Sequence, residues 1–447
     1  MSSSDHHLEF DVAVVGGGIV GCAVLRYLSL RTRLRCVMLE KEEQVLTGAS
    51  GGNSAILHEP AEEDGVVNPI ELRCVSEGSR EARELLRVTA PHLPFRRCGA
   101  LVVAWDEEQR TRLAELQARA LKNGVSDAQL LSPQQVAERE PLLAAGQLGA
   151  LLVPGETVMD SWWLASFFLL QALSNGASLI RGCHIIKGTP LFDGDGARQS
   201  GWELECSAGR RVRCGLVINA AGLFGDVVEG IRTAGAPVPF TIKPRRGQFL
   251  VFKKPTSPLL NHIIYPVPSA TTKGVLLTPT VHGPVFVGPT ATEQPSRDDR
   301  SIDPTESRRL LAAAARMCPA LALQPVAAEY VGIRPATEHT DYQIQAHPTQ
   351  RWITCAGIRS TGATGSLGVA SFIGTTMLGK FYDSDPLPAL TGVKSDGEID
   401  ADSAMVAKML FEAIQARHQH IIRMRDLNPP WDTEITHPLS RLGLSKL

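Results

Sequence analysis

The sequence predicts an α/β protein in which a parallel sheet of the Rossmann type is interleaved with an α+β part that contains a mixed or antiparallel sheet. Three observations predict this fold. A strand, a glycine-rich turn, a helix and a second strand follow one another within residues 10–40. Apolar strand patterns recur at residues 210–222 and 351–378. Four short strand-like runs lie between residues 240 and 288, split by Pro, Gly and Ser.

The first element is the strand "FDVAVV" at residues 10–15, and the turn "GGGIVG" follows it directly. Gly16, Gly18 and Gly21 satisfy the G-x-G-x-x-G spacing. In this motif the first glycine makes a tight turn, the second admits a pyrophosphate and the third lets the helix pack on the strand. The second strand ends in Glu40, which can accept hydrogen bonds from a ribose diol. The unit therefore predicts a bound dinucleotide, and the acid disfavours NADP.

The later elements favour FAD over NAD. After Glu40 the chain enters a loop rich in Gly and Ser, "TGASGGNSAILHEP" at residues 47–60, where a dehydrogenase continues with alternating strands and helices. Residues 351–378 predict a strand, a glycine-rich turn and an apolar helix. The N-terminus of that helix suits the N1/O2 edge of a reduced flavin, where negative charge develops. A purely structural turn is the alternative.

The composition excludes several other classes of protein. The 447 residues suffice for two intertwined domains, and a net charge of −2 gives no sign of a nucleic-acid partner. The nine cysteines are scattered and form no C-x-x-C pair, which predicts reduced thiols in an intracellular protein and no metal site. The most apolar run, at residues 162–173, is too short to span a bilayer and predicts a buried helix.

The chain ends in Ser445, Lys446 and Leu447. S-K-L at a C-terminus is an address read by the peroxisomal import receptor, so we expect this receptor as a partner and a peroxisome or glycosome as the location. In a bacterial protein the same ending carries no address, and a cytoplasmic location is expected instead. A chance ending is the other alternative.

Several stretches carry a resemblance to a known family. They are "GGNSAILHEP", "CGALVVAWDEEQ", "EREPLL", "VINAAG", "KPRRGQFLVF", "KGVLLTPTVHGPVFVGPTA" and "YVGIRPATEHTDYQI". Over about residues 9–380 the chain resembles the FAD-dependent oxidoreductases of the D-amino-acid oxidase and glycine oxidase superfamily. Its long "KGVLL" stretch is similar to the soluble glycerol-3-phosphate oxidases, with L-2-hydroxyglutarate oxidases and dehydrogenases as near neighbours.

The resemblance implies a discontinuous domain organisation. A Rossmann-type FAD-binding domain, like that of glutathione reductase, would gather residues 1–95, 150–225 and 335–385, and a substrate domain would gather residues 96–149 and 226–334. The strand-like runs support the second domain independently, whereas residues 106–147 predict helices with one proline-marked break. Residues 386–447 form a C-terminal extension, with an amphipathic helix predicted over residues 401–424.

The resemblance also implies that the FAD is bound non-covalently, since no attachment residue stands out. The residues expected to line it are Gly16, Gly18, Gly21, Glu40, Lys41, Ser50, Asn53, Ser54, Ala220, Gly222, Gly357, Arg359, Gly362 and Thr364. The glycines of residues 47–60 would let the backbone run close to the pyrophosphate and the flavin.

His58 is the predicted catalytic base. A histidine titrates near neutrality, so its neutral form can take the proton of a substrate hydroxyl. The motif N-S-x-x-x-H resembles the family, in which this histidine faces the flavin with the residue that corresponds to Ser54 nearby. The alternative is a loop histidine bonded to backbone. Glu59 follows directly, and an acid there can raise the pKa of the histidine.

Two cationic residues are predicted to hold the rest of the substrate. Arg334, in "VGIRPATEHTD", offers a rigid donor fork that binds carboxylate or phosphate. Lys273 matches a lysine that the resembled oxidases place near the substrate, and its point charge suits phosphate. A surface salt bridge is the alternative for each. Arg245 and Arg246 are adjacent on a strand, so at most one of them faces the site.

The sequence thus predicts FAD-dependent oxidation of a small anionic α-hydroxy substrate. The first choice is sn-glycerol 3-phosphate, oxidised to dihydroxyacetone phosphate by hydride transfer to flavin N5, with O2 (giving H2O2) or a quinone as the acceptor. An L-2-hydroxyglutarate oxidase or dehydrogenase is the alternative. The further alternatives are an amino-acid or amine oxidase and a flavin-binding scaffold without activity.

Overall fold

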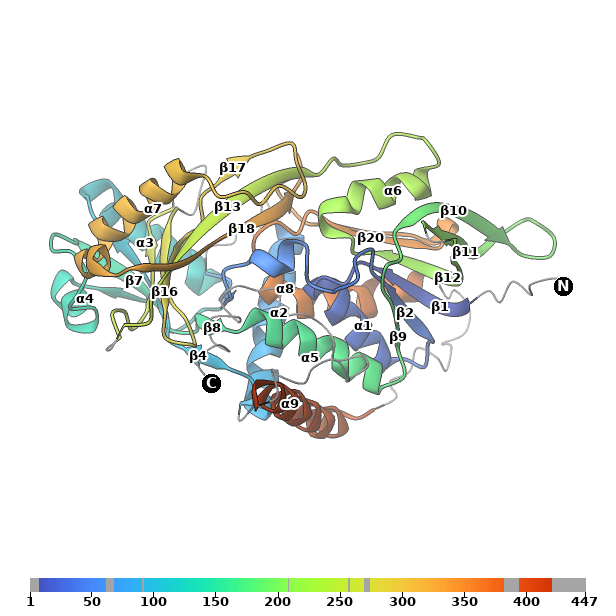
Figure 1. Cartoon of the computed structure of the whole chain (residues 1–447), viewed down its shortest axis with the longest axis horizontal. Helices are drawn as coiled ribbons and strands as arrows, with labels where there is room; N and C mark the ends of the chain where they lie inside the picture. The colour runs from blue at the N-terminus through green and yellow to red at the C-terminus, as the bar shows by residue number, and fades with distance from the viewer. Residues whose placement is uncertain are drawn as a thin grey trace.

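The computed structural model describes residues 8–61, 68–90, 92–207, 209–255, 258–268, 274–381 and 394–419. Lys273 and the terminal Ser445, Lys446 and Leu447 lie outside these residues, so their roles in substrate binding and import stay predictions. The described chain forms two large sheets and a small one, with helices packed around them (Figure 1).

The first sheet is built on the predicted strand–helix–strand unit. Its parallel strands are β1 (Leu8–Val15), β2 (Cys36–Leu39), β9 (Ser178–Ile180), β12 (Arg211–Asn219) and β20 (Trp352–Ala356). Its antiparallel strands are β10 (Ile185–Phe192), β11 (Gln199–Cys206) and β19 (Gln343–His347). The order is β10-β11-β12-β1-β2-β9, with β20 against the end of β12 and β19 beyond it. All four residues of β2 are buried, as expected for a parallel strand covered on both faces.

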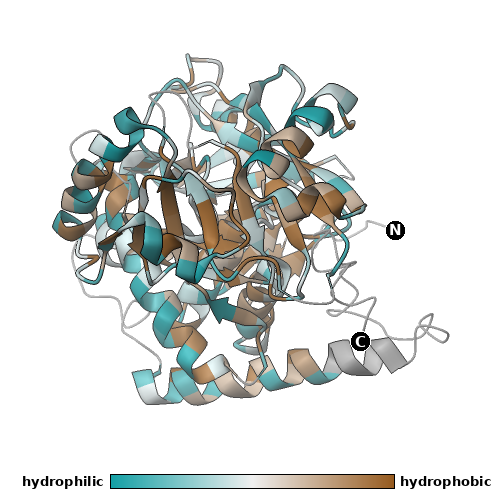
Figure 2. Cartoon of the chain, turned by 90° about the vertical axis from the view of Figure 1, so that its left-hand side faces the viewer, coloured by the Kyte–Doolittle hydropathy of each residue, from teal (hydrophilic) through white to brown (hydrophobic). Residues whose placement is uncertain are grey.

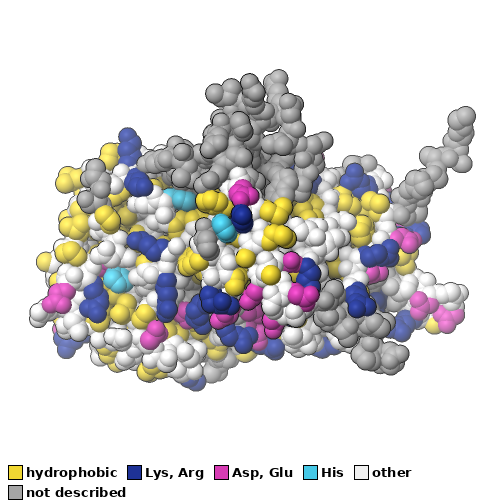
Figure 3. All heavy atoms as spheres, turned by 90° about the horizontal axis from the view of Figure 1, so that it is seen from below, with side chains coloured by type: hydrophobic (Ala, Val, Ile, Leu, Met, Phe, Trp, Pro, Cys, Tyr) yellow, Lys and Arg dark blue, Asp and Glu magenta, His cyan; other side chains and the backbone are white. Residues whose placement is uncertain are grey.

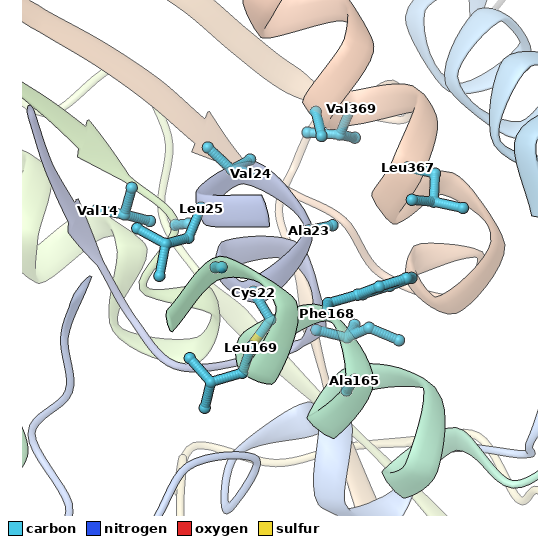
Figure 4. Close-up of a cluster of buried hydrophobic side chains, with 14 of the residues drawn as sticks. Val14, Cys22, Ala23, Val24, Leu25, Ala165, Phe168, Leu169, Leu367 and Val369 are labelled. Carbon is cyan, nitrogen blue, oxygen red and sulfur yellow. The ribbon is translucent and has the colours of Figure 1, made fainter. Parts of the chain in front are cut away.

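Helix α1 (Ile19–Arg31) packs between α5 (Ser161–Ser174) and α8 (Gly362–Phe372). Figure 4 shows this core, to which α1 contributes Cys22, Ala23, Val24 and Leu25, α5 contributes Ala165, Phe168 and Leu169, and α8 contributes Leu367 and Val369. Every residue of α5 from Ser161 to Ala172 is buried, so the helix predicted from this apolar run is confirmed.

The second sheet is larger and mostly antiparallel. Its strands are β5 (Ala100–Ala104), β6 (Gln129–Leu131), β7 (Gly149–Val153), β13 (Lys243–Phe252), β14 (Ile263–Pro266), β15 (Leu276–Pro279), β16 (Val285–Gly288), β17 (Thr292–Glu293) and β18 (Val326–Ala336). They follow the order β17-β13-β16-β15-β14-β5-β7-β6, with β18 antiparallel to β13. Four of them, β13 to β16, are the four runs expected from the sequence. Apart from the parallel pair β5–β14, the strand pairs are antiparallel, as predicted.

The remaining elements cover or connect the two large sheets. The helices are α2 (Pro69–Thr89), α3 (Glu107–Lys122), α4 (Pro133–Arg139), α6 (Gly225–Thr233), α7 (Pro304–Met317) and α9 (Asp396–Gln419). The small sheet joins β3 (Ile56–Leu57), β8 (Thr157–Met159) and β4 (Phe95–Arg97). Single turns are η1 (Ala49–Gly52), η2 (Gly222–Phe224), η3 (Pro319–Leu323), η4 (Pro348–Gln350), η5 (Ile373–Met377) and η6 (Leu378–Phe381). Strands of the second sheet are mainly hydrophobic, whereas the helices outside it carry hydrophilic residues (Figure 2).

Two of the expected domain limits fall inside structural elements. The limit at residue 150 cuts β7, which pairs with β5 in the second sheet although residues 150–225 were expected in the first domain. The limit at residue 226 cuts α6, which packs on β20, β10 and β12 of the first sheet. Both shifts have the same cause, because strand pairing and helix packing decide the domain of a segment and the local sequence does not.

The C-terminal extension contributes a helix to the first domain. α9 lies along α2 and α5 at the lower edge of Figure 1, where the sequence predicts an amphipathic helix. Val406, Ala407 and Leu410 are buried in the core that α2 and α5 share. The Arg87 guanidinium of α2 lies 3.3 Å from the Asp400 carboxylate of α9. The extension therefore packs on α2 and α5 through α9.

Cys183 and Cys206 form a disulfide, with Cα atoms 5.2 Å apart. The other seven cysteines are free thiols, and six of them are buried. The expectation of reduced thiols throughout is therefore wrong for this pair. Cys183 precedes β10 and Cys206 ends β11, so the antiparallel pairing of the two strands brings them together across 23 residues of sequence. No spacing motif marks such a pair.

On the face shown in Figure 3, basic and acidic side chains are interspersed. Among the helices that the structure describes, none is long and apolar enough to cross a membrane. Within the same residues no group of three or more His, Cys, Asp or Glu side chains is placed to hold a metal ion.

Helices α2 and α8 touch backbone to backbone through two glycines. A Cβ atom added at Gly78 of α2 would lie 2.1 Å from the carbonyl oxygen of Thr364, and one added at Gly368 of α8 would lie 2.0 Å from that of Cys74. Real Cβ atoms do not approach backbone so closely. This contact fixes the position of the α8 N-terminus at the edge of the first sheet.

We expect Gly78→Ala to lower the free energy of unfolding by about 1–3 kcal/mol, because the added methyl group must push the two helices apart. Gly230→Ala in α6 is the matched control, since a Cβ there meets nothing within 4 Å and alanine favours a helix. Denaturant unfolding of both variants measures the difference. Equal stabilities would show that the α2–α8 contact is loose.

Candidate active site

A cavity of about 1120 Å³ runs along the carboxyl ends of β1, β2, β12 and β20 and continues over the sheet of β13 and β18. In an open parallel sheet, ligands bind at this edge. Residues from both domains line it, including His58, Arg245, Tyr265, Arg334 and Arg359. The cavity is thus large enough for a dinucleotide and a small substrate together.

The glycine-rich turn takes the shape that its motif predicts. Gly16 has a φ of +108°, and a Cβ there would lie 2.5 Å from the carbonyl oxygen of Ala220. A Cβ at Gly21 would lie 2.0 Å from the carbonyl oxygen of Gly16, so helix α1 packs directly on the turn. Gly18 is the N-cap of α1, and Ser50 Oγ accepts a hydrogen bond from the N–H of Ile19 at 2.9 Å. The first turn of α1 therefore faces the cavity with little side-chain bulk.

Glu40 ends β2 in the expected place. Its Oε2 accepts a hydrogen bond from the Gly17 N–H at 2.6 Å, and its Oε1 accepts one from the Glu42 N–H at 2.9 Å. Burial raises the pKa of Glu40, and these two N–H groups oppose the rise. Lys41, also expected at the cofactor, lies 4.2 Å from the centre of the Phe224 ring at the same cavity. The carboxylate is held rigidly at the rim that a ribose would occupy.

The loop after β2 brings Ser50, Asn53 and Ser54 to the cavity wall. Asn53 Oδ1 accepts a hydrogen bond from the Ala55 N–H at 2.7 Å, which fits the positive φ of 54° at Ala55. Gly52 lies against strand β18, since a Cβ there would be 2.7 Å from Gly332 Cα. The loop thus joins the first domain to the sheet that carries Arg334.

The ends of β12 and β20 supply the remaining expected cofactor residues. Ala220, Gly222, Gly357, Arg359 and Gly362 line the cavity, and Gly222 and Gly357 have φ values of +54° and +71°. Arg359 Nη2 lies 3.5 Å from Glu71 Oε2 on α2. Thr364 is fully buried behind the wall, and its hydroxyl accepts a hydrogen bond from the His58 N–H at 2.8 Å. Its structural task is to hold the histidine.

His58 follows β3 and lines the cavity, with 15% of its side chain exposed. Its Nδ1 lies 3.2 Å from Oε2 of Glu156 and 3.3 Å from the hydroxyl of Tyr265. Glu59 does not face the imidazole, because its carboxylate pairs with Arg83 of α2. The sequence predicts Glu59 as the acid beside the histidine. The structure shows that this acid is Glu156. Glu156 and Tyr265 are the residues that sequence reasoning missed, since they belong to distant loops and strands and no motif marks them.

Arg334 lies opposite Arg245 in the β13–β18 ladder, and both line the cavity. Burial and the charge of Arg245 lower the pKa of Arg334 to about 10. Its nearest acceptors are the carbonyl oxygens of Arg246 and Thr290, at 3.4–3.5 Å. Among the described residues no carboxylate lies within ion-pair distance of it. Arg246 turns to the other face and donates to the Ser301 carbonyl, so one of the two adjacent arginines faces the site, as predicted.

These features fit FAD on structural grounds. The turn leaves no space for side chains at Gly16 and Gly17, the N-terminus of α1 offers N–H groups and positive dipole charge to a pyrophosphate, and Glu40 lies where a ribose would bind. The N-terminus of α8 faces the same cavity through Gly362 and Ala363, where it favours negative charge on a flavin. Fold and site together define a dinucleotide-binding oxidoreductase.

Comparison with known proteins narrows this class. Residues 11–374 match the family model DAO, FAD dependent oxidoreductase, so the chain belongs to this family and its cofactor is FAD. Glycerol 3-phosphate dehydrogenase of Caloramator mitchellensis is 27% identical over 377 residues, which cover 81% of this chain and 73% of that protein. Mitochondrial L-2-hydroxyglutarate dehydrogenase of Homo sapiens is 30% identical over 295 residues, which cover 63% of this chain and 61% of that protein.

A solved structure supports the fold. The dithionite-reduced L-alpha-glycerophosphate oxidase of Mycoplasma pneumoniae, with FAD bound, aligns with a TM-score of 0.74 over 86% of this chain and 98% of that chain. The sequence identity is 23%, so this likeness shows the fold alone. The expected family and fold class are confirmed.

We expect Glu40→Gln to weaken FAD binding about tenfold or more, since a hydrogen bond to a charged acceptor contributes about 1.5–3 kcal/mol. Glu43→Gln is the matched control, because its side chain is exposed and does not line the cavity. Flavin fluorescence during titration of the apoprotein measures both dissociation constants. Equal dissociation constants in the two variants would show that Glu40 holds the turn and does not contact FAD.

Proposed function

We propose that this protein oxidises a small α-hydroxy compound that carries an anionic group, and that the substrate is sn-glycerol 3-phosphate, which becomes dihydroxyacetone phosphate. The observation that carries the proposal is the pair Arg245 and Arg334 on facing strands, in the cavity that also holds His58. The match to the glycerol 3-phosphate dehydrogenase of Caloramator mitchellensis supports it.

The arginine pair favours a doubly charged group. Arg334 is buried and lies beside the charge of Arg245, and both lower its pKa. Among the described residues its contacts are long ones to carbonyl oxygens, so an incoming anion replaces weak bonds by strong bidentate ones. A phosphate carries enough charge and oxygen atoms to bind both arginines, whereas one carboxylate satisfies one fork.

His58 has the position and chemistry of a base for the substrate hydroxyl. It lines the cavity, and its backbone is tied to Thr364 in α8 and its ring to Glu156. A neutral imidazole accepts the hydroxyl proton while a hydride leaves the carbon that bears the hydroxyl group. FAD, when bound, supplies the two-electron acceptor. We propose that the electrons then pass to O2, giving H2O2, or to a quinone, and that the FAD is held without a covalent bond.

One observation favours L-2-hydroxyglutarate as the second candidate substrate. Arg112 and Arg119 of α3 line the same cavity and add positive charge at a second place. A dicarboxylate needs two separate cationic contacts, and the human L-2-hydroxyglutarate dehydrogenase is among the relatives. An amino-acid oxidase needs a site for an ammonium group, for which the cluster of arginines is unfavourable.

The substrate is tested by anaerobic bleaching of the flavin. We expect glycerol 3-phosphate to bleach it and uncharged glycerol to fail, because glycerol lacks the anion that the arginines bind. L-2-hydroxyglutarate and a set of amino acids complete the series. Bleaching by L-2-hydroxyglutarate alone would select the second candidate, and a flavin that no compound bleaches would favour the scaffold without activity.

We expect His58→Ala to retain FAD and to lower the rate of flavin bleaching by about 10²–10⁴-fold, the usual contribution of a general base. Stopped-flow absorbance under anaerobic conditions measures the rate. A normal rate in this variant would remove His58 as the base.

We expect Arg334→Lys to raise the apparent dissociation constant for glycerol 3-phosphate at least tenfold, because lysine cannot provide the bidentate fork. Arg246→Lys is the matched control on the same pair of strands, since its side chain points away from the cavity. Saturation of the bleaching rate with substrate gives both constants. Equal constants would place the anion elsewhere.

A further inference from the structure

We propose that Glu156 is a positioning residue that fixes the orientation and tautomer of His58 and stabilises its protonated form, with Tyr265 as the second support. The inference deepens the proposed function, on which the role of His58 as a base rests. Neither residue carries a sequence signal, and both are brought to His58 by the fold alone.

The contacts form a closed triangle of polar atoms. Glu156 Oε2 lies 3.2 Å from His58 Nδ1 and accepts a hydrogen bond from the Tyr265 hydroxyl at 3.2 Å. The same hydroxyl lies 3.3 Å from His58 Nδ1. Glu156 and Tyr265 are 5% and 4% exposed, so water does not compete for these bonds.

The carboxylate of Glu156 is held in place from its other side. Its Oε1 accepts a hydrogen bond from the Glu59 N–H at 2.9 Å, and its backbone carbonyl accepts one from the Gly99 N–H at 2.9 Å. Glu156 lies in the turn between β7 and β8. It is therefore anchored to the second sheet through β7 and to the small sheet through β8. A carboxylate bonded at both oxygens has one orientation, and it imposes that orientation on the ring.

This arrangement selects the tautomer that a base requires. A neutral imidazole has one N–H and one acceptor nitrogen, and a carboxylate beside Nδ1 places the hydrogen there. Nε2 then acts as the acceptor. When Nε2 takes a proton, the imidazolium charge lies beside the Glu156 carboxylate, which stabilises it.

Glu59, the described carboxylate that follows His58 in sequence, is engaged elsewhere, whereas Glu156 faces the ring. Glu59 pairs with Arg83 and accepts a hydrogen bond from Ser79 at 3.3 Å. Gly155 leaves space for the Glu59 carboxylate, since a Cβ at Gly155 would lie 2.2 Å from Glu59 Oε1. Among the described residues, the charged or titratable groups around His58 include Glu156 and Tyr265 at the ring, the Glu59–Arg83 pair behind it, and Arg112, Glu115 and Arg119 of α3 along the cavity.

The chain contains a matched control for this pair. His262 Nδ1 lies 2.7 Å from Glu140 Oε1, and the same oxygen accepts a hydrogen bond from the His262 N–H at 2.6 Å. Glu140 is 1% exposed, and neither residue lines the large cavity. Glu140→Gln therefore makes the same chemical change, in a buried histidine–carboxylate pair, without touching the site.

The test compares Glu156→Gln with Glu140→Gln in the FAD-loaded protein. Histidine labelled with ¹³C at Cε1 reports the titration of each imidazole by NMR, and the signal missing from His58→Ala identifies His58. We expect Glu156→Gln to lower the pKa of His58 by about one to three pH units, since a carboxylate at this distance stabilises the charged ring. The apparent pKa on the acid side of the pH profile of the bleaching rate with glycerol 3-phosphate should decrease by the same amount. Glu140→Gln should leave the pKa of His58 and this pH profile unchanged.

An unchanged His58 titration in Glu156→Gln, or an equal change in Glu140→Gln, would overturn the inference. If Glu156→Gln does not bind FAD, Glu156→Asp decides, because it keeps the charge at a longer distance and should give a smaller decrease. The NMR titration needs no turnover. A failure of glycerol 3-phosphate and L-2-hydroxyglutarate to bleach the flavin would therefore overturn the proposed function and leave the role of Glu156 to be decided separately.

Discussion

The contact between Gly52 and Gly332 holds the candidate site together. A Cβ at Gly332 would lie 1.9 Å from the carbonyl oxygen of Gly52, so the loop after β2 and strand β18 touch with bare backbone. The Tyr330 hydroxyl reinforces this contact by donating to the Asn53 carbonyl at 3.1 Å. The loop continues to His58 and the strand continues to Arg334. One glycine contact thus fixes the loop that carries His58 relative to the strand that carries Arg334.

The rest of the site uses the same principle, with rigid backbone contacts behind polar side chains. Gly78 and Gly368 fix the N-terminus of α8, and Thr364 in that helix accepts the bond that holds the His58 backbone. Glu156 is fixed by the N–H groups of Glu59 and Gly99. A site that binds an anion beside two arginines needs such rigidity, because a flexible wall would let the arginines separate and relax their repulsion.

Electrostatics separate the two ends of the cavity. At one end Glu40 and the N-terminus of α1 suit a ribose and a pyrophosphate, and at the other the arginines of β13 and β18 suit a small anion. His58 stands in the same cavity, with the Glu156 carboxylate beside its ring. Under the proposed function, this separation would let one cavity hold FAD and a small anionic substrate without bringing their charges together.

The sequence alone determined the parts of this protein that depend on local spacing. Spacing over a few residues predicts the glycine motif with Glu40, the buried helix α5 and the four strands β13 to β16, and the structure bears them out. It also predicts that at most one of Arg245 and Arg246 faces the site, and the fold then places Arg245 at the cavity. The tertiary structure decided what depends on contacts between distant segments. It placed β7 in the second sheet and α6 on the first, and it joined Cys183 to Cys206. It also brought Glu156 and Tyr265 to His58, whereas Glu59 pairs with Arg83. Such pairings are set by which strands lie side by side, and neighbouring residues in the sequence carry no record of that.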